Sequence, residues 1–204
     1  VLPLDDRGVE LFGVKFGQHR THPTSRVYSY RPPPAPLPAK SAAAVGGRSW
    51  KLSATIDRDE GEGGVLYAMG NGNSGFVTFV QGDRLVFDYN CFGEHHVVES
   101  SIPVPVGRSV VGVDFERTGT GGVARLVIDG RSCGEIEIPF VMRVISSMGA
   151  SVGFDHGLPV SRRYDDAFPF EGTLHRVDIA LQAPQSTQEA DAAASDGRSG
   201  MARQ

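Results

Sequence analysis

Residues 76–89 read FVTFVQGDRLVFDY and contain the clearest structural pattern in the chain. Two runs rich in Val and Phe flank the short polar segment QGDR at 81–84. β-Branched and aromatic residues favour strands, and a Gly-Asp pair between two such runs is typical of a tight turn. The stretch therefore predicts an antiparallel β-hairpin.

Apolar and polar side chains alternate with the two-residue period of a β-strand on both sides of this hairpin. Residues 50–56 alternate apolar and polar side chains, and residues 172–181 do so over ten positions. Asp129-Gly130 separates two further apolar runs, and both turn positions favour the positive φ of a type I′ hairpin. No window has a sustained helical period. We therefore predict an all-β fold, an antiparallel two-sheet sandwich of the jelly-roll or concanavalin-like type with about ten strands.

Composition divides the chain into three parts. Residues 1–47 form a predicted connector, with a short strand at 26–30 and a Pro-rich segment at 31–38. Proline fixes φ, so this segment must be extended. It contains a P-x-x-P motif, which SH3 domains can bind. We favour the alternative that it lies as a strap along the edge of the domain. Residues 48–182 form the sandwich. Residues 183–204 contain no Val, Ile, Leu, Phe, Tyr or Trp and are predicted to be a disordered tail.

Charge and composition exclude several classes of partner. The formal net charge of the 204 residues is -4, which argues against a nucleic-acid partner. No apolar stretch approaches the roughly 20 residues that span a bilayer, so no membrane partner is expected. Two cysteines, Cys91 and Cys133, cannot build a disulfide framework. The first residues lack the charged-then-apolar order of a signal peptide, which favours a cytoplasmic location.

Two motifs suggest chemistry that their surroundings do not support. Residues 70–75 read GNGNSG and match the dinucleotide-binding pattern, but a strand follows them where a helix N-terminus would be needed. We therefore expect a glycine-rich loop between strands. His95 and His96 are neighbours in a predicted strand, so they point to opposite faces and cannot chelate one ion.

The long loop at 155–166 contains three acidic side chains, Asp155, Asp165 and Asp166. Calcium accepts carboxylate ligands in flexible geometry, but the spacing of an EF-hand loop is missing. Arg162 and Arg163 lie between these acids and could pair with them. We therefore expect an Asp–Arg network that shapes the loop, and neither a metal site nor a catalytic residue in this chain.

Several motifs together resemble a known family. Residues 64–70 (GVLYAMG) and 75–93 (GFVTFVQGDRLVFDYNCFG) look like the C-terminal domain of large bacterial arylsulfatases. Residues 126–130 (LVIDG) and 168–174 (FPFEGTL) follow in the order and spacing of that family. The resemblance covers about residues 2–181. It implies the β-sandwich domain of a sulfate-ester hydrolase.

The resemblance also implies what this chain lacks. In the family a separate catalytic domain carries a formylglycine and a calcium ion. Formylglycine forms within C/S-x-P/A-x-R, and neither Cys91 nor Cys133 is followed by that pattern. We therefore expect no cofactor here and a non-catalytic accessory domain, whose partner is the sulfatase catalytic domain in the same or a separate chain.

A second hypothesis is a free-standing, lectin-like module that binds glycans. In a sandwich, the loops 70–75, 90–96 and 155–166 could gather at one rim. A third hypothesis is an orphaned remnant of a truncated sulfatase. The side chains that could contact a ligand at the rim are Asn71, Asn73, Asn90, His95, Asp155 and Tyr164.

Overall fold

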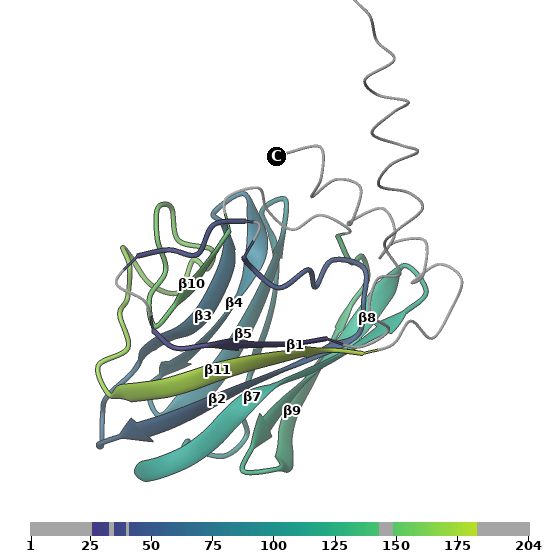
Figure 1. The fold of residues 1–204 in the computed structure, drawn as a ribbon. Helices are drawn as coiled ribbons and strands as arrows, with labels where there is room; N and C mark the ends of the chain where they lie inside the picture. Colours follow the sequence, from purple (N-terminus) through teal and green to yellow (C-terminus); the bar gives the residue numbers. More distant parts are fainter. Residues whose placement is uncertain (1–25, 33–34, 40, 143–148, 183–204) are drawn as a thin grey trace, which may run out of the picture.

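The computed structural model describes residues 26–32, 35–39, 41–142 and 149–182. Their strands pair antiparallel in two sheets, and Figure 1 shows the sheets as facing layers, which confirms the predicted all-β sandwich. Residues 1–25 of the predicted connector at 1–47, and the predicted tail at 183–204, lie outside the described residues.

Eleven strands are described. The six-stranded sheet has, in spatial order, β1 (Arg26–Tyr30), β11 (Thr173–Leu181), β2 (Trp50–Arg58), β7 (Gly107–Thr118), β8 (Gly121–Ile128) and β9 (Arg131–Ile138). The five-stranded sheet has β10 (Ala150–Val152), β3 (Gly64–Asn71), β4 (Ser74–Gln81), β5 (Arg84–Cys91) and β6 (Glu94–Glu99). Sequence patterns missed β10, because three residues are too short to display a period.

Hairpin turns carry the positive φ angles expected of type I′ geometry. Asp129 and Gly130 have φ of 47° and 79°, as the sequence predicts. The turn between β5 and β6 has the same character but uses Phe92 (φ 53°) and Gly93 (φ 87°). A bulky side chain is uncommon in this region of φ, so Phe92 is an outlier.

The main core lies between the sheets and is organised around Trp50. Its ring stacks on Phe76 from the opposite sheet at a centroid distance of 4.9 Å and on Phe115 at 5.1 Å. All three side chains are 2% exposed or less. Ala43 and Val45 are also buried in this core, so the sandwich includes part of the segment predicted as connector.

A second, smaller core covers the outer face of the five-stranded sheet. The segment 153–172, between β10 and β11, places Val160 and Tyr164 against Phe79 of β4. The Pro-rich segment lies along the same sheet, where Leu37 and Ala150 of β10 exchange backbone hydrogen bonds of 2.7 and 3.1 Å. The five-stranded sheet is therefore covered on both faces.

We predict that Trp50→Ala lowers the free energy of unfolding by about 3–5 kcal/mol, because it leaves a cavity between three stacked rings. Val106→Ala, at a side chain that is 60% exposed, should change it by less than about 0.5 kcal/mol. Urea denaturation measures both. A loss below about 1 kcal/mol for Trp50→Ala would contradict the central position of this residue.

Candidate functional site

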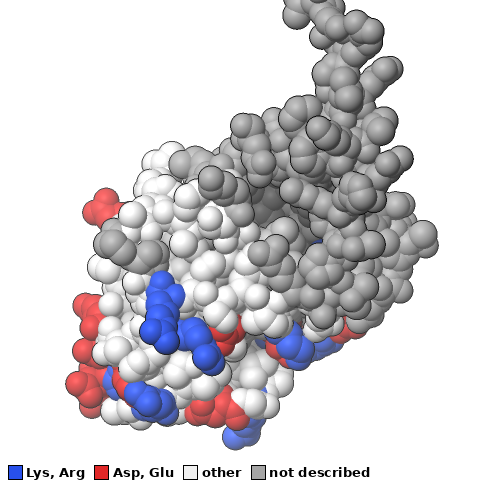
Figure 2. Space-filling model, viewed as in Figure 1, with Lys and Arg blue, Asp and Glu red and all other residues white. Residues whose placement is uncertain are grey.

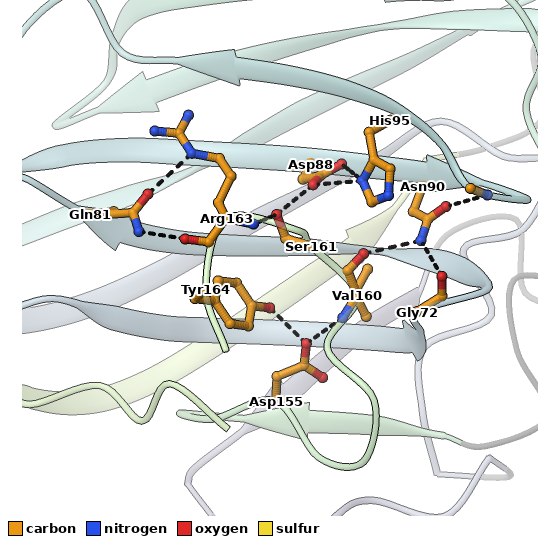
Figure 3. Close-up of polar contacts among 11 residues, drawn as sticks. Gly72, Gln81, Asp88, Asn90, His95, Asp155, Val160, Ser161, Arg163 and Tyr164 are labelled. Atoms are coloured by element: carbon orange, nitrogen blue, oxygen red, sulfur yellow. Dashed lines mark hydrogen bonds and ion pairs between the residues drawn. The ribbon is translucent and has the colours of Figure 1, made fainter. Parts of the chain in front are cut away.

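The candidate site lies where the 153–172 segment crosses the outer face of the five-stranded sheet. Side chains alternate along β5, so Leu85, Phe87 and Tyr89 face the main core, whereas Asp88 and Asn90 face outward. Both outward polar side chains are nevertheless at most 1% exposed, because the segment covers them. Figure 3 shows the polar contacts that result.

Asn90 joins three loops. Its side-chain amide donates hydrogen bonds of 3.1 Å to the backbone oxygens of Gly72 and Val160. Its side-chain oxygen accepts a hydrogen bond of 2.8 Å from the backbone N–H of Gly93. The N–H of Gly72 in turn donates to the carbonyl of Leu158 at 3.1 Å. The structure thus brings the 70–75, 90–96 and 155–166 loops together at one end of the sheet, which we call the rim.

Asp88 anchors the same segment from the middle of the sheet. It accepts a hydrogen bond from the Ser161 hydroxyl at 2.5 Å and faces His95 Nδ1 at 3.0 Å (Figure 3). In a hydrolytic triad the histidine stands between the serine and the carboxylate. Here the carboxylate stands between the other two, so the Ser161 hydroxyl donates to Asp88 and not to the imidazole of His95.

Asp155 and Tyr164 form a buried pair. One carboxylate oxygen of Asp155 accepts hydrogen bonds from the Tyr164 hydroxyl at 2.7 Å and from the Val160 N–H at 2.8 Å. Burial raises the pKa of Asp155 above its ordinary value, although both hydrogen bonds oppose the shift. Burial, with the charge of Asp155, also raises the pKa of Tyr164.

The expected Asp–Arg network within the loop takes a different form. Arg163 pairs with Glu99 of β6, and its Nε donates to the side-chain oxygen of Gln81 at 3.1 Å. Asp155 is held by Tyr164 and a backbone N–H instead. Arg163 therefore connects the loop to β4 and β6 and not to the acids of the loop itself. Closeness in the sequence does not determine which carboxylate an arginine side chain reaches in the fold.

The six candidate ligand residues have different positions. Asn90, His95, Asp155 and Tyr164 are occupied by internal contacts. Asn71 accepts the N–H of Asn73 at 2.9 Å and shapes its own turn. Asn73 is exposed at the tip.

The exposed side chains of the rim were not all predicted. Phe92 is 70% exposed and Leu158 is 73% exposed. Arg162 is exposed as well, and its Nη2 lies 3.6 Å from the position that a Cβ on Gly93 would take. A signal was available for Phe92, since a large aromatic residue directly before the glycine of a two-residue turn has no core to enter.

Further properties of the described residues concern metal binding, membrane-spanning helices and surface charge. Within the described ranges no group of three or more His, Cys, Asp or Glu side chains is arranged to hold a metal ion. No helix in the part of the chain that is described is long and apolar enough to cross a membrane. On the face seen in Figure 2, described Lys and Arg side chains lie close to Asp and Glu side chains. Lys51 of β2 and Asp114 of β7 form one such ion pair in the sheet.

Comparison with protein-family models and with curated proteins gives no match. Solved structures do match. Domains LG4-5 of the mouse laminin alpha1 chain give 15% identity and a TM-score of 0.48, covering 75% of this chain and 40% of that one. The Caenorhabditis elegans galectin LEC-6 gives 10% identity and a TM-score of 0.43, and the match covers 74% of this chain and 95% of the galectin chain. A SAP-like pentraxin from Limulus polyphemus gives 13% identity and a TM-score of 0.43, and the match covers 81% of this chain and 80% of the pentraxin chain. Such likenesses do not assign a ligand to this chain.

We predict that Asp155→Asn removes a pH-dependent loss of stability. Both donors contact the same oxygen, so the amide oxygen of Asn can replace it. Because the pKa of Asp155 is raised in the folded state, the native protein binds the extra proton above the ordinary pKa of 3.8. The wild-type protein should therefore lose stability, relative to Asp155→Asn, as pH rises from about 3.8 through the folded pKa.

Urea denaturation of both proteins between pH 3 and pH 7, with Asp165→Asn as the control, measures this difference. Asp165 lies in the same loop but is exposed, so its substitution should give no comparable pH-dependent difference. A wild-type protein that gains stability over this range relative to Asp155→Asn would show that the hydrogen bonds outweigh burial.

Proposed function

We propose that this chain is a non-catalytic, lectin-like binding module that contacts a saccharide at the rim. The observation that supports the proposal is Phe92, which is 70% exposed on a backbone with φ of 53°. Asn90 links the turn that contains Phe92 to the loops that contain Asn73, Leu158 and Arg162.

The backbone conformation of Phe92 has an energetic cost. A non-glycine residue in the left-handed region costs about 1 kcal/mol or more, and Asn, Asp and Gly tolerate it best. The corresponding turns between β4 and β5 and between β8 and β9 use Gly82-Asp83 and Asp129-Gly130. Phe92 neither fills the core nor relieves strain, so a role in contacting a ligand explains its place in the turn.

The exposed side chains of the rim match the chemistry of a sugar. A pyranose ring has an apolar C–H face and a periphery of hydroxyl groups. Phe92 and Leu158 offer an apolar surface for the face. The amide of Asn73 and the guanidinium of Arg162 offer donors, and the amide also an acceptor, for the hydroxyl groups.

The proposal assigns no catalytic step to this site. Ser161 is bonded to a carboxylate and not to an imidazole, so its hydroxyl is not activated as a nucleophile. Both cysteine thiols have a pKa raised by burial, which disfavours the reactive thiolate.

We predict that Phe92→Asn weakens saccharide binding at least tenfold while raising stability by about 0.5–1 kcal/mol. Asparagine tolerates positive φ but offers no aromatic face. A panel of neutral and anionic oligosaccharides, tested at millimolar concentration by titration calorimetry and thermal unfolding, measures both effects. Phe140→Ala is the matched control, because Phe140 is 53% exposed but lies outside the rim.

A second variant tests whether the rim must be assembled. Asn90→Asp keeps the acceptor for Gly93 but loses both donations to Gly72 and Val160. Binding should fall although Phe92 remains. If no oligosaccharide binds the wild-type protein, or if Phe92→Asn and Phe140→Ala bind equally well, the proposed function is wrong.

A second candidate is an accessory domain of an arylsulfatase-type protein. It is favoured by the ordered motifs at 64–70, 75–93, 126–130 and 168–174. In that role the chain would pack on a catalytic domain, which would supply the formylglycine and the calcium ion.

For this candidate we predict no aryl sulfate turnover by the pure 204-residue chain above the rate of a mock purification. Association with a sulfatase catalytic domain in analytical ultracentrifugation would support the accessory role. Turnover that follows the protein through successive columns would contradict it.

A further inference from the structure

Arg162 occupies a position at the rim that sets it apart from its neighbours in the chain. Ser161 and Tyr164 are buried. Arg163 is exposed, but its guanidinium pairs with Glu99. Arg162 is also exposed, and it makes no hydrogen bond or ion pair with any residue in the described ranges. Its guanidinium is therefore open to solvent on a loop whose other polar side chains are engaged.

The backbone around Arg162 is fixed to the five-stranded sheet. The Ser161 hydroxyl donates to Asp88 at 2.5 Å and accepts the N–H of Arg163 at 3.3 Å (Figure 3). The carbonyl of Arg163 accepts a hydrogen bond of 2.9 Å from the side-chain amide of Gln81. A ligand that binds Arg162 therefore has to order its side chain but not the loop.

The side chain of Arg162 is directed toward the turn between β5 and β6. Its Nη2 lies 3.6 Å from the position that a Cβ on Gly93 would take. Gly93 directly follows Phe92, the exposed aromatic residue of that turn. The rim therefore has a positive charge at the turn that presents its aromatic ring.

The acidic side chains of the same loops do not neutralise this charge by direct pairing. Glu94 faces His96 Nε2 at 3.8 Å. Asp165 and Asp166 are exposed. None of the three acids forms an ion pair with Arg162 in the part of the chain that the structure describes. The donors of the guanidinium thus remain available to an anion from outside.

Exposed arginines on the six-stranded sheet lack this combination of features. Arg108 is paired with Asp57 at 2.6 Å. Arg131 has no such pair, but its turn between β8 and β9 contains no aromatic residue. The whole chain has a net charge of -4, so its overall charge does not attract anions. A preference for an acidic ligand would have to come from a local group such as Arg162 beside Phe92.

We propose that the saccharide bound at the rim is acidic, and that Arg162 binds its carboxylate or sulfate group. This inference rests on the proposed function, because Phe92 supplies the contact with the sugar ring. A guanidinium presents paired N–H donors that match the oxygens of a carboxylate or sulfate. The charge-assisted pair favours the acidic sugar over a neutral sugar of the same shape.

The test compares matched acidic and neutral sugars on the full chain by titration calorimetry. Trigalacturonate is paired with its methyl ester, and a sulfated galactose trisaccharide with its unsulfated counterpart. At low ionic strength the wild-type protein should bind the acidic member of at least one pair about threefold or more tightly. Sodium chloride at about 0.3 M should reduce this ratio, because salt screens an exposed pair. The pair that shows the preference distinguishes a carboxylate from a sulfate.

Three variants assign the preference to its source. Arg162→Gln should bring the acidic-to-neutral ratio to about one with the Tm of the wild-type protein, since the side chain has no bonded partner in the described ranges. Arg131→Gln changes the net charge equally and should keep the wild-type ratio. Phe92→Asn should weaken both members of a pair by a similar factor.

The outcomes separate this inference from the proposed function. If the wild-type protein binds only neutral sugars, or if Arg162→Gln keeps the wild-type ratio, the acidic ligand is wrong while the saccharide site stands. If the wild-type protein binds no saccharide, acidic or neutral, both are wrong.

Discussion

The outer face of the five-stranded sheet contains polar side chains that its covering segment must satisfy. Asn90 is fully buried beneath residues 153–172, and an unbonded amide there would cost free energy. Its three hydrogen bonds fix the positions of the 70–75, 90–96 and 155–166 loops relative to one another. The arrangement of the rim loops therefore follows from the hydrogen bonds that one buried amide must make. Asp88 and Asp155 are likewise buried, and they accept hydrogen bonds from Ser161, Val160 and Tyr164 of the same segment.

This arrangement separates residues that support a binding surface from those that could form it. The most polar side chains of the region are buried and engaged, whereas the exposed positions include Phe92, Leu158 and Arg162. Because the buried polar groups are already bonded to one another, the exposed side chains above them rest on a satisfied polar layer. The Ser161 hydroxyl belongs to the same layer, since it donates to Asp88 and accepts the N–H of Arg163.

The end of the sandwich offers two different kinds of chemistry. The rim presents the apolar side chains of Phe92 and Leu158, the amide of Asn73 and the guanidinium of Arg162 on the outside of the five-stranded sheet. Arg163, the next residue in the chain, pairs with an acid of β6 instead. Two adjacent arginines thus differ, since one connects the loop to the sheet and the other has no ion pair in the described ranges.

The sequence by itself determined the all-β class and the hairpins, because alternation and turn residues are local properties of the chain. Alternation along β5 then sets Asp88 and Asn90 on the face away from the main core. Alternation along a strand does not show which segment covers a face of the sheet, so Asn90 and Asp155 were expected to contact a ligand. Only the tertiary structure decided that residues 153–172 cover Asn90, that Asp155 within this segment is buried against Tyr164, and that Phe92 stays exposed. The physical reason is that burial depends on a segment more than 60 positions further along the chain, whose place is fixed by packing and hydrogen bonds rather than by local pattern.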